Sequence, residues 1–277
     1  MVPQPGEMCI QFLVTRKQSG IPDRARLPRF IYRRRRGGGI DRHHRVPTDV
    51  IAVGRIHASC GAGDSLRSNG DGGLITLIFR NKAEIHRPFY LLTCAHVAGG
   101  IQRSPPAYRE LVSDDANAKP FAHTLVNSTA DGEALSYDIA LARIDEGALP
   151  LVELRVRGEK PRLKSILPAR LVQPGTGVQV TRNNLTARGT VVTVHASATI
   201  SYSSGSYDVH NLWGVNVTAS PGDSGGLVYR GSEAIGLVVA ASPEGWLWFQ
   251  PLESAIAFLN TFSPVPVAVF NPSTNPP

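Results

Sequence analysis

The stretch Ser220-Pro221-Gly222-Asp223-Ser224-Gly225-Gly226 decides how this sequence is interpreted, because it has the composition of a tight turn that presents one hydroxyl. Its glycines can adopt φ values closed to other residues, and Pro221 fixes the entry. Asp223 stands beside the serine, in position to anchor the turn from inside. Such a turn points backbone N–H groups into one concavity, which a developing oxyanion requires. The alternative is an ordinary glycine-rich turn between two strands, and the rest of the chain has to decide between them.

The composition of the chain favours an all-β protein. Its 277 residues are enough for one large core or two medium ones. Charged residues make up 18% of the chain, and 27 glycines with 21 prolines predict many turns and few long helices. Three cysteines (Cys9, Cys60 and Cys94) allow at most one disulfide, which is few for a secreted protein. Since no apolar run has the length of a membrane span or a signal peptide, we expect a cytoplasmic protein without a membrane partner.

The positive charge is confined to the N-terminal part of the chain. Residues 1–50 contain 11 Lys and Arg but 4 Asp and Glu, whereas the remaining residues contain 18 of each. The net charge of +7 therefore belongs to the N-terminal segment, and the neutral body offers no nucleic-acid surface. We expect residues 1–50 to dock a regulatory protein or to inhibit the enzyme in cis.

Residues 1–57 are expected to form an N-terminal extension. It has strands at 9–17 and 49–58, joined by a flexible loop over 18–48 that contains the run Arg33-Arg34-Arg35-Arg36. That run is open to four interpretations: a site for an acidic partner, a nucleic-acid or membrane patch, a processing site, or a solvated linker.

The body of the chain has the pattern of two successive strand-rich halves. We expect a first β-barrel over 58–160, a second over 161–262, and a disordered, proline-rich tail over 263–277. Expected strands in the two halves cover 73–80, 89–94, 122–127, 138–144, 178–182, 189–200, 214–218, 227–229, 234–242 and 246–249. Residues 251–260, which begin with proline and have helical apolar spacing, predict one closing helix.

Three residues at expected strand ends have the chemistry of nucleophilic catalysis. A serine hydroxyl is a weak nucleophile until a base takes its proton, and the base needs a carboxylate to orient it. The chain supplies His96, Asp138 and Ser224 in that order. A lone histidine after a strand, or a lone aspartate before one, is usually structural, but the joint pattern favours a catalytic triad.

At these residues the chain resembles the chymotrypsin/trypsin-like serine peptidases. Leu92-Thr-Cys-Ala-His-Val97 is similar to their histidine motif, Asp138-Ile-Ala-Leu141 to their aspartate motif and Gly222-Asp-Ser-Gly-Gly226 to their serine motif. The resemblance implies an all-β fold of two antiparallel Greek-key barrels followed by a C-terminal helix. It also implies His96 as general base, Asp138 as its orienting partner, Ser224 as nucleophile, and the N–H groups of Gly222 and Ser224 as the oxyanion hole.

The chain departs from the secreted members of this family in two ways. Val97 stands where those members have a cysteine, and no cysteines flank Ser224, so the resemblance is to an intracellular bacterial branch. Members activated by cleavage pair a new apolar N-terminus with the aspartate that corresponds to Asp223. Here only Ile51-Ala52-Val53-Gly54 weakly matches such a terminus, so the enzyme is either active as made or held by its N-terminal segment.

The resemblance also implies which residues contact the substrate. Thr218 takes the place at the base of the P1 pocket, followed by Ala219, and Val239, Ala240 and Ala241 form an apolar wall. Because no carboxylate stands at the pocket base, we expect cleavage of proteins or peptides after small or medium apolar residues. We expect no cofactor and no metal, since the eight histidines are scattered and no HExxH motif occurs. A non-catalytic, protease-like interaction module and an esterase are the alternatives.

Overall fold

The computed structural model describes residues 10–14, 17, 21–22, 26–34, 39–52, 57–58, 66–68, 71–80, 88–101, 110–111, 120–128, 130–145, 163–182, 185–220, 222–242, 244–265 and 267. The chain divides into two compact units, Met1–Arg55 and Ile56–Pro277. The division falls two residues before the expected end of the N-terminal extension. Among the described residues, no helix is long and apolar enough to cross a membrane.

The first unit contains a three-stranded sheet. Its strands are β1 (Ile10–Val14), β2 (Phe30–Arg34) and β3 (Ile40–Ala52), in the order β1-β3-β2. The expectation of a flexible loop over 18–48 is therefore wrong for the described residues of β2 and for the first part of β3. These two strands pair antiparallel, Phe30 opposite Pro47, and the Arg45 guanidinium lies 4.4 Å from the centre of the Phe30 ring. A cation over an aromatic face stabilises a pairing that the charge-rich sequence does not suggest.

The second unit contains the remaining described strands, one described 3-10 helix and one described α-helix. Its elements are β4 (His57–Ala58), β5 (Leu66–Ser68), β6 (Asp71–Gly73), β7 (Leu77–Arg80), β8 (Phe89–Thr93), β9 (Glu110–Leu111), β10 (Ala122–Asn127), β11 (Ala134–Leu135), β12 (Ala140–Ile144), β13 (Ser165–Ile166), the 3-10 helix η2 (Ala169–Leu171), β14 (Gly177–Arg182), β15 (Leu185–Tyr202), β16 (Gly205–Val215), β17 (Leu227–Arg230), β18 (Glu233–Ser242), β19 (Trp246–Pro251) and the α-helix α2 (Leu252–Leu259).

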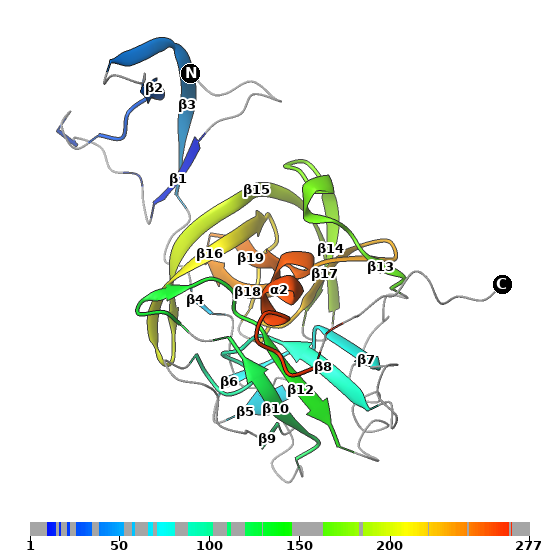
Figure 1. Ribbon diagram of the computed structural model, residues 1–277. Helices are drawn as coiled ribbons and strands as arrows, with labels where there is room; N and C mark the ends of the chain where they lie inside the picture. The colour runs from blue at the N-terminus through cyan, green and yellow to red at the C-terminus, as the bar shows by residue number, and fades with distance from the viewer. Residues whose placement is uncertain are drawn as a thin grey trace. The chain divides into compact units, whose positions relative to one another are not determined.

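Two large sheets build this unit (Figure 1). A five-stranded sheet has the order β7-β8-β12-β10-β9, and a nine-stranded sheet has the path β11-β16-β19-β18-β17-β14-β15-β4, with β13 beside β18. Together they form a two-barrel arrangement, and with the C-terminal α2 this confirms the expected all-β class.

Most of the strands expected in the body are present, but three of them differ in their bounds. The strand expected at 189–200 is the longer β15, and it forms a hairpin with β16, which begins at Gly205 and not near 214. The strand expected at 73–80 is interrupted, because the amide of Leu74 donates to the Ser224 carbonyl (2.7 Å) instead of to a neighbouring strand.

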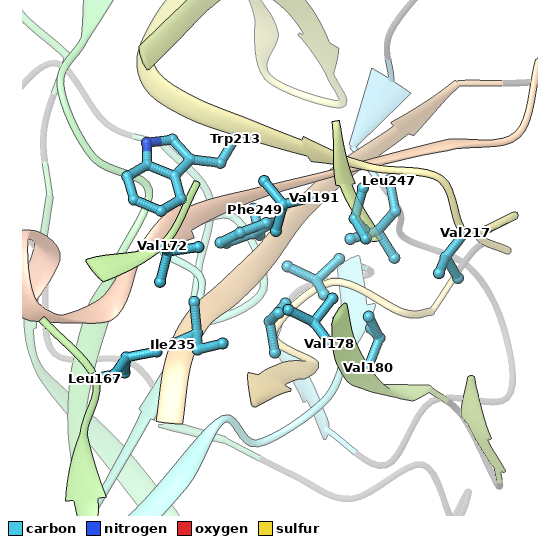
Figure 2. Close-up of a cluster of buried hydrophobic side chains, with 13 residues drawn as sticks. Leu167, Val172, Val178, Val180, Val191, Trp213, Val217, Ile235, Leu247 and Phe249 are labelled. Atoms are coloured by element: carbon cyan, nitrogen blue, oxygen red, sulfur yellow. The ribbon is translucent and has the colours of Figure 1, made fainter. Parts of the chain in front are cut away.

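The core of the second barrel fixes the strands that flank the glycine-rich turn around Ser224. Figure 2 shows apolar side chains from β14, β15, β16, β18 and β19 converging on one cluster. Trp213 and Phe249 are at most 1% exposed, and their rings meet edge to face with centroids 5.8 Å apart. Side chains of this size contribute most of the packing energy of such a core.

The chain after α2 begins in an ordered conformation. Asn260 and Val267 exchange two hydrogen bonds, 2.8 and 3.2 Å long, and Val267 is 4% exposed. The expected disorder of 263–277 is therefore wrong for the described residues 263–265 and 267. The rest of that tail lies outside the described residues.

Candidate active site

His96 and Asp138 meet because their strands are neighbours. β8 and β12 pair antiparallel with Thr93 opposite Ala140, so the turn that follows β8 and the segment that precedes β12 lie at the same end of the sheet. There Asp138 Oδ2 lies 2.5 Å from His96 Nδ1, and its Oδ1 accepts the His96 backbone N–H at 3.1 Å. Both side chains are at most 1% exposed. A carboxylate on Nδ1 leaves Nε2 of the ring as the atom that takes a proton.

Gln250 holds the segment around Asp138 from the second barrel. Its Oε1 accepts the backbone N–H of Asp138 at 2.8 Å, and its Nε2 donates to the carbonyls of Ser136 and His210 at 3.1 and 2.8 Å. The Gln250 side chain is fully buried, so these bonds satisfy groups that water does not reach. Ser128 adds a second support, because its Oγ accepts the Ile139 N–H at 3.0 Å.

The turn around Ser224 needs its glycines for two separate reasons. Gly222 and Gly225 have φ of +96° and +81°, values that favour glycine. A Cβ on Gly225 would also lie 2.0 Å from the Leu74 carbonyl oxygen, and one on Gly226 would lie 2.3 Å from that of Thr181. The turn is thus packed directly against backbone from both barrels.

Asp223 anchors this turn through its side chain. Its Oδ2 accepts the Arg182 Nε–H at 2.7 Å and the Ser220 backbone N–H at 2.8 Å. Arg182 also donates from Nη2 to the Ser220 hydroxyl at 2.8 Å. Asp223 is 1% exposed, so its charge is compensated by a cation within the same unit. The segment 51–54 is the one that weakly matches an activating N-terminus. Its first two residues, Ile51 and Ala52, belong to β3 and pair with Leu13 and Val14 of β1. Val53 and Gly54 lie outside the described residues.

The hydrogen bonds of the turn leave two backbone donors for a ligand. The N–H groups of Asp223, Gly225 and Gly226 are bonded to the carbonyls of Ser220, Val238 and Asp223. Within the described part of the chain, no acceptor is found for the N–H groups of Gly222 and Ser224. These two N–H groups, without an acceptor among the described residues, are the ones that the sequence predicts as oxyanion donors.

The Ser224 hydroxyl bonds to a backbone carbonyl and not to His96. Its Oγ donates to the Val239 carbonyl at 3.2 Å, while His96 Nε2 is buried and has no partner among the described residues. Ser224 itself is 0% exposed. The structure therefore brings the three predicted residues into one buried region without the serine–histidine hydrogen bond.

Cys94 and Tyr202 complete the buried surroundings of His96. Cys94 Sγ lies within 4.8 Å of the ligand atoms of His96 and Asp138, so these three residues are the one group of metal-ligand type among the described residues. Burial, followed by the Asp138 charge, raises the pKa of the Cys94 thiol, which donates to the Val238 carbonyl at 3.0 Å. The protonated Cys94 thiol thus serves here as a hydrogen-bond donor to the backbone of β18. The Tyr202 ring lies 5.1 Å from the His96 ring, centroid to centroid.

The residues expected to line the substrate pocket are on two segments. Val239 and Ala240 are fully buried in β18, and Ala241 is partly buried. Ala219 packs on the core of the second barrel, while Thr218 is exposed and follows β16. A Cβ on Gly245, in the turn between β18 and β19, would lie 3.5 Å from the Thr218 hydroxyl.

Comparison with known proteins supports the fold. No protein-family model matches the chain. A glutamic acid-specific serine protease described as using a histidine triad in substrate binding is similar in structure, with a TM-score of 0.52 and 18% sequence identity; the match covers 72% of this chain and 97% of that one. Protease A of Thermobifida fusca matches with a TM-score of 0.48, 16% identity and coverages of 72% and 95%, and the chymotrypsin of Cellulomonas bogoriensis with 0.44, 17%, 74% and 98%. The chain thus has the fold of the chymotrypsin/trypsin-like serine proteases.

Sequence reasoning missed three residues that shape the site. Arg182 ends β14 and Gln250 stands in β19, far from the motifs along the chain. A glutamine in the apolar run Trp246–Pro251 is an unusual buried polar residue, and that signal was available. Tyr202 had no such signal, because its contact with His96 depends on the length of the β15–β16 hairpin.

Proposed function

We propose that the protein is a serine endopeptidase that acts through His96, Asp138 and Ser224. The observation that carries this proposal is the buried Nδ1–Oδ2 contact of 2.5 Å between His96 and Asp138, in a fold whose glycine turn presents Ser224. A carboxylate in that position fixes the tautomer and favours the imidazolium that forms during the reaction.

The reaction follows from these roles. Rotation of the Ser224 side chain away from the Val239 carbonyl lets Oγ attack the carbonyl carbon of a peptide bond, while His96 Nε2 takes the hydroxyl proton. The N–H groups of Gly222 and Ser224 stabilise the oxyanion, each contributing roughly 10²–10³ in rate. His96 then gives the proton to the leaving amine, and water, deprotonated by the same nitrogen, releases the acyl group from Ser224.

We expect small or medium apolar residues at P1. The reason is the absence of a carboxylate at Thr218 and the apolar character of Val239, Ala240 and Ala241. Peptide-library profiling tests this expectation, and a profile dominated by cleavage after Arg, Lys or Glu would contradict it. A faster turnover of small acyl esters than of peptides would instead favour the esterase.

Cleavage profiling of a proteome with the wild type and the Ser224→Ala variant tests the activity itself. We expect new peptide termini with the wild type alone. Equal sets of termini in both samples would favour the non-catalytic interaction module, for which the unformed bond between Ser224 and His96 is the supporting observation.

We also propose that the basic residues 1–50 bind a regulatory protein in the cytoplasm. The charge excess of this segment and its own sheet support a separate role. Reversing Arg33 and Arg45 to glutamate in the full chain should weaken co-purification of an acidic partner. Unchanged co-purification and unchanged activity would count against this role.

A further inference from the structure

One edge of β18 continues past the nucleophile turn. β19 pairs with β18 along one edge, from Gly236 to Ser242, and β17 pairs with the other edge up to Leu237. The turn then bonds to Val238, and the Val239 carbonyl accepts the Ser224 hydroxyl. The edge at Ala240 and Ala241 therefore lies immediately beyond the nucleophile, where an extended peptide that reaches Ser224 would add as a strand.

The chain itself occupies this edge. β4 pairs antiparallel with β18, with Ala58 opposite Ala240 and His57 opposite Ala241. On its other side β4 pairs with β15, His57 opposite Ser201. β4 is thus a strand inserted between β18 and the end of the long β15–β16 hairpin, and its backbone groups meet strands on both sides.

The direction of β4 is that of a peptide entering the site. As the β4 sequence ascends from His57 to Ala58, its partners on β18 descend from Ala241 to Ala240, toward Val239. The strand therefore runs toward Ser224 with its C-terminal end leading. A substrate whose acyl part is transferred to Ser224 has to run in the same direction along this edge.

The burial of the triad agrees with an occupied site. Ser224 is 0% exposed and His96 1% exposed, although a nucleophile and its base must both reach an external peptide. Tyr202, the residue after the β4 partner Ser201, packs its ring on His96. β4 covers the β18 edge, and the end of the β15–β16 hairpin, which pairs with β4, covers His96.

We infer that β4 is an internal, substrate-like occupant of the peptide-binding edge, and that an external peptide substrate has to displace it. This inference rests on the proposed peptidase function and adds its regulation: pairing of β4 with β18 weakens the binding of peptide substrates without abolishing it. Displacement is accessible because β4 has two residues and adds few backbone hydrogen bonds to each neighbour. The apparent affinity for a peptide falls in proportion to the fraction of molecules in which the edge is free.

The variant that tests this is His57→Pro/Ala58→Pro in the full chain. Successive N–H groups of a strand point to opposite neighbours, so two prolines remove one donor from each side of β4. The matched control is His57→Gly/Ala58→Gly, which retains both N–H groups. Ser224 is labelled with two probes, a small fluorophosphonate and a tetrapeptidyl phosphonate ending in valine, and the ratio of their rates is measured by intact mass. This ratio cancels differences in the amount of folded protein.

We expect the double proline to raise the peptidyl-to-small-probe ratio by about tenfold or more, since two backbone hydrogen bonds correspond to such a factor. The glycine control should change it less than about threefold. An unchanged ratio, with both probes labelling Ser224, would overturn the inference and leave the peptidase function standing.

A binding measurement keeps the inference testable even if no probe labels Ser224 in any variant, the result that would remove the peptidase function. In the Ser224→Ala background, fluorescence anisotropy of a labelled Ala-Ala-Ala-Val peptide should show about tenfold tighter binding with the two prolines. Equal binding with and without them would reject β4 as an occupant.

Discussion

The pair formed by Arg182 and Asp223 allows the most demanding prediction on the nucleophile turn. Arg182→Met keeps the length and apolar stem of the side chain but removes the cation from a carboxylate that is 1% exposed. Removing one partner of a buried ion pair costs about 3–5 kcal/mol, because the remaining charge stays in a region of low polarity. For a domain of this size, that loss corresponds to a fall in Tm of roughly 6–20 °C.

The same substitution has a functional consequence. Asp223 lies between the two donors proposed for the oxyanion, Gly222 and Ser224, so a turn that shifts to hydrate the carboxylate misaligns them. Loss of one aligned donor lowers the rate by roughly 10²–10³. We therefore expect slower phosphonylation of Ser224 by a small fluorophosphonate, by roughly 10²-fold, measured on samples verified as folded by circular dichroism.

Two further variants test whether the lost ion pair causes the destabilisation of Arg182→Met. Arg230→Met makes the same chemical change at an exposed pair, where Arg230 and Glu233 lie 3.8 Å apart, and should cost at most about 1 kcal/mol. Arg182→Met/Asp223→Asn removes the isolated charge and should recover part of the stability. Equal free energies of unfolding for Arg182→Met and Arg230→Met in urea denaturation would contradict a stabilising role of the buried pair.

Three other predictions concern the remaining supports of the site. Gly225→Ala should lower the free energy of unfolding by more than about 2 kcal/mol, because its Cβ would lie 2.0 Å from the Leu74 carbonyl oxygen. The control Gly231→Ala, also at positive φ but with open space around it, should cost about 1 kcal/mol. Equal losses for the two variants in chemical denaturation would contradict this. Gln250→Leu leaves the Asp138 N–H unbonded and should cost about 1–3 kcal/mol and slow labelling of Ser224, and a fully active, equally stable variant would refute the supporting role. Burial, followed by the Asp138 charge, raises the pKa of the Tyr202 hydroxyl in the folded chain. Above pH 10 the unfolded chain therefore loses this proton first, and the free energy of unfolding falls by up to about 1.4 kcal/mol per pH unit. Tyr202→Phe should flatten that decline in urea titrations from pH 9 to 11.

The parts of the fold that the sequence predicts are those encoded locally. Apolar runs bounded by turns identify β8, β10, β17, β18 and β19 within a few residues, and proline followed by helical spacing identifies α2. The motifs around His96, Asp138 and Ser224 are local in the same sense. Strand pairing then brings the motifs of His96 and Asp138 to one end of the five-stranded sheet.

What the sequence did not predict depends on distant partners. β2 and the first part of β3 contain charges and a proline, and they are stabilised by pairing and by Arg45 on Phe30. Arg182 and Gln250 act on residues 41 and 112 positions away. The pairing of β4 with β18 joins residues nearly two hundred positions apart, and a two-residue strand has no periodicity to detect.

The central claim is that His96 activates Ser224, and covalent labelling tests it most directly. A small fluorophosphonate is incubated with the full-length wild type, His96→Ala and Ser224→Ala, and the labelled residue is identified by peptide mass spectrometry. We expect stoichiometric modification of Ser224 in the wild type and none at that position in either variant. An unmodified Ser224 in the folded wild type, or equal modification in His96→Ala, would contradict it.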